Sequence, residues 1–148
     1  MAVCCGCLGA QAQSTITIRM LEARTGKLIE TSNYLVRVNH EQTAHANWVV
    51  QNEDGTGKLT LPGGVSTLSI TATYDSAMYV YVNCDSASEK GNPGEHWYDV
   101  SEILTAGLVA PNGCRKPRDA AKRRPIAKPG EFVFFVRKLN SFEQVMEE

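Results

Sequence analysis

Residues 54–72 carry the pattern that most restricts the fold of this chain. An Asp-Gly-Thr-Gly turn at 54–57 leads into a short alternating segment at 58–61, and a Pro-Gly-Gly corner at 62–64 leads into a second one at 67–73. Alternation of apolar and polar side chains indicates strands that bury one face. Glycines in the turns supply the positive φ that tight connections between strands require. The stretch therefore predicts a small antiparallel β-domain.

Similar segments along the rest of the chain predict further strands. These segments are 14–21, 34–38, 47–51, 78–82 and 131–137. The apolar run 132–136 is almost continuous, which is typical of a strand in mid-sheet or covered on both faces. One helix is expected at 101–106, capped by Asp99 or Ser101 and ended by Gly107. The predicted fold class is all-β: an antiparallel β-sandwich of about seven strands with one short helix.

Length and charge limit the organisation and the partners of the chain. A chain of 148 residues suits one domain. We assign the sandwich to residues 14–140 and an acidic tail to 141–148. The net charge of −1 does not favour a nucleic-acid binder. No stretch of the sequence is long and apolar enough to predict a transmembrane segment.

Residues 1–13 differ from the rest in being small, apolar and uncharged. Ala10-Gln11-Ala12 has the small-x-small pattern that signal peptidase recognises. We therefore expect the remnant of an export signal, and a mature protein in the periplasm, on the cell surface or outside the cell. Lipid attachment at a cysteine and a metal cluster of Cys4, Cys5 and Cys7 are the alternatives.

Removal of that signal would leave two cysteines, Cys84 and Cys114. An even number of cysteines in an exported domain predicts a disulfide between them. The alternative is a pair of unrelated buried thiols.

Three segments of the first half of the chain resemble one known family. Thr25-Gly26-Lys27-Leu28, the stretch 54–64 and the strand 68–72 resemble the carboxypeptidase regulatory-like family. Domains of that family have the transthyretin-like, or prealbumin, sandwich. The chain departs from the family pattern at Leu28, where the family usually has proline.

Segments of the second half resemble small exported bacterial proteins that carry this domain. These segments are 99–104, 107–114 and 129–137. The resemblance implies a secreted, non-catalytic sandwich and no particular ligand. We accordingly expect no catalytic residues and no cofactor.

The segment 115–128 is the main candidate for a binding element, because it holds seven basic residues and one acid. The basic residues are Arg115, Lys116, Arg118, Lys122, Arg123, Arg124 and Lys128. Such cations pair with phosphate or carboxylate groups, so the expected partner is an anionic envelope polymer or glycan. Aromatic residues that would stack on bases are not interleaved, so nucleic acid is not expected. The alternative is a solvated loop.

His96, Trp97 and Tyr98 form a second candidate, with aromatic faces beside a polar ring. Its alternative is a loop that Trp97 anchors on the core. His40 and His45 with Glu41 could chelate a metal ion, but we expect a solvated loop there.

Carboxylates at Glu53, Asp54 and Asp85 could bind calcium at the end of a strand. We expect Glu53 and Asp54 to be turn residues instead, so no metal site is predicted.

The sequence favours an exported, non-catalytic binding or structural module. One alternative is a self-assembling, pilus- or filament-like subunit that joins other proteins through edge strands, with 11–15 as a donor arm. Another is a small ligand-binding protein or hydrolase that uses the 96–98 loop. No Gly-x-Ser-x-Gly motif occurs in the sequence, which argues against an enzyme of that type.

Overall fold

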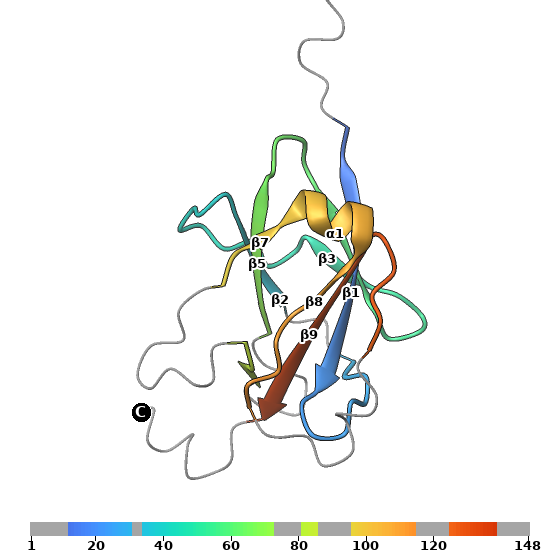
Figure 1. Cartoon of the computed structure of the whole chain (residues 1–148). Coiled ribbons are helices and arrows are strands. Elements are labelled where there is room, and N and C mark those ends of the chain that lie inside the picture. The colour runs from blue at the N-terminus through green and yellow to red at the C-terminus, as the bar shows by residue number, and fades with distance from the viewer. Residues whose placement is uncertain (1–11, 31–33, 73–80, 86–95, 115–124, 139–148) are drawn as a thin grey trace, which may run out of the picture.

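The computed structural model describes residues 12–30, 34–72, 81–85, 96–114 and 125–138. Within these ranges, nine strands and one helix form two facing sheets (Figure 1). The strands are β1 (Ser14–Glu22), β2 (Tyr34–Val38), β3 (Val49–Gln51), β4 (Gly57–Leu61), β5 (Thr67–Ala72), β6 (Tyr81–Asn83), β7 (Tyr98–Asp99), β8 (Leu108–Val109) and β9 (Glu131–Lys138). The helix α1 is Val100–Ala106. The predicted all-β sandwich with one short helix is confirmed.

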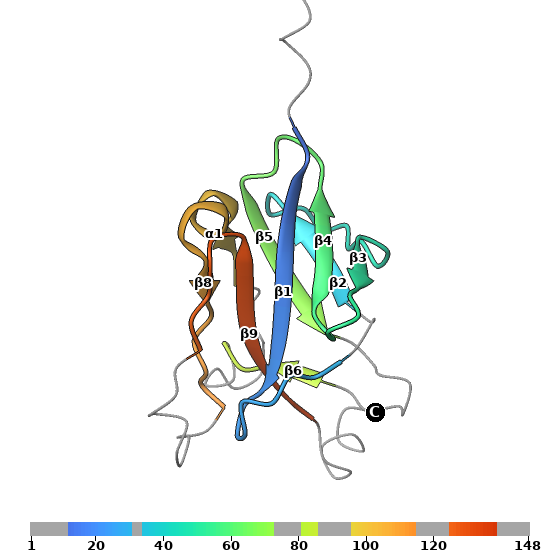
Figure 2. The same cartoon turned by 90° about the vertical axis from the view of Figure 1, so that its right-hand side faces the viewer.

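The larger sheet has the order β3-β4-β1-β9-β6, and β8 also pairs with β9. Figure 2 shows this sheet with β1 between β9 and β4. β1 runs antiparallel to β4, with Ser14 opposite Leu61 and Thr17 opposite Lys58. The smaller sheet has the order β2-β5-β7.

The expectation of a wholly antiparallel sandwich is wrong for two pairings. β9 runs parallel to β1, with Thr17 opposite Glu131, and also parallel to β8. A parallel pair needs a long connection, because the chain must return to the same end of the sheet before it re-enters. Residues 110–130 provide such a connection between β8 and β9. The alternation of apolar and polar residues indicates which face of a strand is buried. It does not indicate whether the strand runs parallel or antiparallel to its neighbours.

The core between the sheets is formed by the inward faces of the long strands. Its fully buried members include Ile16, Ile18, Leu59, Leu68 and Phe132.

A second buried cluster lies on the other face of β9. It contains Leu21, Ala23, Cys84, Val133 and Phe135. All five residues from Phe132 to Val136 are therefore buried, which confirms that this strand is covered on both faces.

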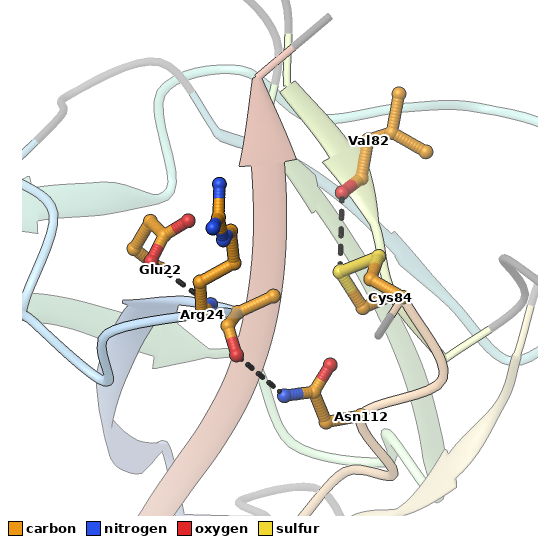
Figure 3. The surroundings of a disulfide bond; sticks show 7 residues. Glu22, Arg24, Val82, Cys84 and Asn112 are labelled. Carbon is orange, nitrogen blue, oxygen red and sulfur yellow. Dashed lines mark hydrogen bonds between the residues drawn. A yellow bond between two sulfur atoms is a disulfide. The ribbon is translucent and has the colours of Figure 1, made fainter. Parts of the chain in front are cut away.

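The predicted disulfide is confirmed: Cys84 and Cys114 are joined, with their Cα atoms 4.9 Å apart. Neighbouring hydrogen bonds hold the same region. Gly113 N donates to Cys84 O at 2.8 Å. Asn112 Nδ2 donates to Ala23 O at 2.9 Å, a bond drawn in Figure 3. The disulfide and these bonds fix the chain after β8 to the outside of the larger sheet.

The helix α1 begins and ends as the sequence predicts. The Asp99 side chain accepts a hydrogen bond from Ser101 N at 2.8 Å, and Gly107 follows the last turn with a φ of 78°. A Cβ at Gly107 would lie 2.5 Å from Lys128 O, so the position has no room for a side chain. No helix in the described ranges is long and apolar enough to cross a membrane.

Some expectations fall on residues outside the described ranges. The predicted signal remnant at 1–13 lies outside them except for Ala12 and Gln13, and the acidic tail at 141–148 lies outside them entirely. The strand expected at 78–82 is described only from Tyr81.

Candidate functional site

Trp97 and His40 contact each other beside the smaller sheet. Their ring centroids are 4.4 Å apart, with the planes inclined by 31°. The next residue, Tyr98, lies opposite Leu68 and packs on the core, 4.9 Å from the ring of Phe132. Trp97 precedes β7 and contacts His40 instead. Tyr98 therefore anchors this segment, while His40 is exposed and Trp97 and the neighbouring His96 are partly exposed.

An unusual turn places His40 against Trp97. Asn39 and His40 both have positive φ, at 53° and 59°, which is uncommon for residues other than glycine. Asn39 Oδ1 accepts hydrogen bonds from Ser66 N, Ser66 Oγ and Thr67 N at 2.8, 3.1 and 3.4 Å. Its Nδ2 donates to Gly64 O at 3.2 Å. The connection between β4 and β5 thus holds the turn in this backbone conformation, and the turn in turn places the ring of His40 against Trp97.

Replacement of Asn39 by alanine is expected to lower the free energy of unfolding by about 2 kcal/mol, because several hydrogen bonds are lost and asparagine tolerates positive φ better than alanine does. Denaturant unfolding measures the change. Asn39→Asp keeps the accepting oxygen and loses only the donor to Gly64, so its loss should be smaller. An alanine variant as stable as the wild type would contradict the role given to Asn39.

His45 makes a separate contact, with Trp48. The two rings are stacked, 3.7 Å apart and inclined by 7°. His45 also exchanges two backbone hydrogen bonds with Val36, so this loop pairs with β2. His40 and His45 thus pack on different tryptophans. In the described part of the chain, no three histidine, cysteine or acidic residues gather as metal ligands would.

Two of the three candidate calcium ligands have other partners. Asp54 accepts hydrogen bonds from Thr56 N and Thr56 Oγ1 at 3.0 and 2.6 Å, and these bonds hold the pKa of its carboxyl below the usual range. Asp85 accepts from the Tyr98 hydroxyl at 2.5 Å. Burial, followed by this hydrogen bond, raises the pKa of Tyr98. Asp54 thus shapes its own turn. Asp85, which directly follows Cys84, is linked to β7 by its hydrogen bond from Tyr98.

Of the seven candidate cations, Lys128 lies within the described residues. The other six, Arg115 to Arg124, lie outside them. Lys128 is exposed, and its backbone N donates to Glu131 Oε1 at 2.8 Å. Arg19 Nη1 on β1 donates to Ile126 O at 3.3 Å. The described end of the basic segment is therefore attached to both central strands of the larger sheet.

The outer side of the larger sheet carries five polar residues and one exposed valine that sequence reasoning missed as a group. They are Thr15, Thr17 and Arg19 on β1, Lys58 and Thr60 on β4, and Val50 on β3, and we call them the threonine face. The outward positions of β1 follow from its alternation. The neighbours on β4 depend on the register between the strands, which the sequence does not contain.

Comparison of the chain with protein-family models, with curated proteins and with solved structures gave no match. The resemblance to the carboxypeptidase regulatory-like family therefore stays a prediction.

Proposed function

We propose that this protein is a non-catalytic binding or structural module that works outside the reducing cytosol, at the cell envelope or beyond the cell. The disulfide between Cys84 and Cys114 carries the proposal. Disulfides persist in oxidising compartments and are rare in the cytosol. Cell fractionation tests the compartment, since a cytosolic protein with both thiols free would contradict the proposal.

The basic segment 115–128 is the binding element of this proposal, and an acidic polysaccharide is the partner. Its described end is attached through Arg19 and Glu131, so an anion bound to Lys128 would be held beside the larger sheet. The exposed Lys128 can pair with carboxylate or sulfate groups. The resemblance to a family of non-catalytic secreted sandwiches supports the same class of function.

Replacement of Lys122, Arg123 and Arg124 by alanine is expected to weaken binding to an acidic polysaccharide such as polygalacturonate. The attraction is electrostatic, so wild-type binding should fall steeply as salt rises, because the screening length is about 10 Å at 0.1 M. Binding is measured by surface plasmon resonance on immobilised polymer, with neutral dextran as the blank. The control is the double variant Arg24→Ala/Lys27→Ala, which removes two exposed cations elsewhere. Wild-type protein that shows no salt-sensitive binding would refute the proposal.

A further inference from the structure

The outer side of the larger sheet has an open half and a covered half. Leu21, Val133 and Phe135 are buried beneath the region that includes the disulfide, so the covered half offers no contact. Beyond Arg19 toward the start of β1, the side chains of the threonine face are exposed or partly exposed. Val50, at the β3 edge of this face, is 65% exposed. Among the described residues on this side of the sheet, those of the threonine face are therefore the ones that a ligand lying flat on the sheet can reach.

Two cations lie beside Thr17 on this face. Lys58 lies directly opposite Thr17 on β4, and Arg19 follows two residues along β1. Diagonal neighbours on adjacent strands lie about 7–8 Å apart, within reach of long side chains. Glu131 lies opposite Thr17 on the other side, on β9.

The positive charge of this group is only partly balanced. Glu131 is the acid on the same row, and its Oε1 accepts the backbone N–H of Lys128. Among the described residues, no carboxylate forms a salt bridge with Lys58 or Arg19. Two cations therefore lie beside one carboxylate, and the net positive charge of this row suits an anionic ligand.

Hydroxyl groups lie between and beside these charges. Thr15 is opposite Thr60, and Thr17 lies in the row between Lys58 and Glu131. A threonine hydroxyl both donates and accepts hydrogen bonds, so it can pair with the hydroxyl groups of a sugar. A surface with cations, hydroxyls and an exposed aliphatic side chain matches a polymer that carries carboxylates, hydroxyls and C–H groups in turn.

We propose that the threonine face binds an acidic polysaccharide chain, with Lys58 and Arg19 on its carboxylates and Thr15, Thr17 and Thr60 on its hydroxyls. This inference rests on the proposed function and adds the folded surface on which the polymer lies.

The double variant Lys58→Gln/Arg19→Gln tests the charged part of the face. Its dissociation constant for polygalacturonate is expected to rise about tenfold at low salt, with a shallower salt dependence, because two cations are removed. Arg19→Lys keeps the positive charge and should bind nearly as the wild type does, which separates the charge from the hydrogen bond of Arg19 Nη1 to Ile126 O. Lys27→Gln, in an exposed turn elsewhere, is the matched control and should leave binding unchanged.

The double variant Thr15→Val/Thr17→Val tests the hydroxyls at nearly constant shape. It is expected to weaken binding several-fold without changing the salt dependence, because no charge is removed. Circular dichroism and thermal unfolding show whether each variant is folded.

The outcomes separate this inference from the proposed function. Loss of binding in the Lys122, Arg123 and Arg124 variant, with none in Lys58→Gln/Arg19→Gln, would overturn the inference and leave the proposed function intact. Wild-type protein that binds no acidic polysaccharide would overturn both. Equal binding to double-stranded DNA, weakened by the same variants, would overturn the assignment to a glycan.

Discussion

Replacement of Phe134 by alanine is expected to lower the free energy of unfolding by about 3–5 kcal/mol, the usual cost of a phenylalanine removed from a core. Phe134 is 2% exposed, and its ring lies 5.7 Å from that of Phe132 and 6.4 Å from that of Tyr34. β9, which carries it, lies between β1 on one side and β6 and β8 on the other, so the surrounding strands have little freedom to close a cavity.

The measurement is urea unfolding followed by circular dichroism. If the alanine variant does not fold, Phe134→Leu gives a smaller change, about 1 kcal/mol, because most of the volume is kept. The control is Val50→Ala, at a side chain 65% exposed, which should change stability by less than about 0.5 kcal/mol. Equal effects of the Phe134→Ala and Val50→Ala substitutions would contradict the assignment of β9 to the centre of the core.

The strands that the sequence predicts well are those that bury one face along several residues. In β1, Ile16, Ile18 and Met20 are completely buried, as their spacing indicates. The helix was predictable for a different reason, since Asp99 and Gly107 mark its ends chemically. In both cases the local residues alone determine the structure.

Features that depend on contacts distant in sequence could not be predicted. β7 and β8 have two residues each, which is too short for any alternation to show. The parallel pairing of β1 and β9 joins the two ends of the domain, and nothing in either segment specifies its neighbour. The contact between His40 and Trp97 has the same origin, because it depends on hydrogen bonds from Asn39 to the β4–β5 connection.

The candidate binding surface was predictable only in part. The cations of 115–128 stand out in composition, and Lys128 is exposed as a solvent-facing charge should be. Lys58 and Arg19 are single charges in otherwise ordinary strands, so composition does not reveal them. Their proximity follows from the β1–β4 register, in which Lys58 faces Thr17. A cluster of charges from several strands can be recognised only in the structure, whereas a cluster of charges along the chain can be recognised in the sequence.

Loss of the disulfide is expected to lower the free energy of unfolding by about 3–4 kcal/mol. Cys84 and Cys114 are 30 residues apart, and closing a loop of that length restricts the unfolded chain by roughly this amount. Adding reductant to the wild type should therefore move its unfolding midpoint to lower urea.

The double variant Cys84→Ala/Cys114→Ala separates the disulfide from other effects of the reductant. It should unfold near the midpoint of the reduced wild type and should not respond to reductant. The matched control replaces Cys4, Cys5 and Cys7 by serine and should keep the full response. A wild-type midpoint that reductant does not move would show that the bond does not stabilise the fold.

A loss of the expected size means that the native state is substantially less stable wherever thiols stay reduced. The stability of the sandwich would then depend on an oxidising compartment, which is where the proposed function places it.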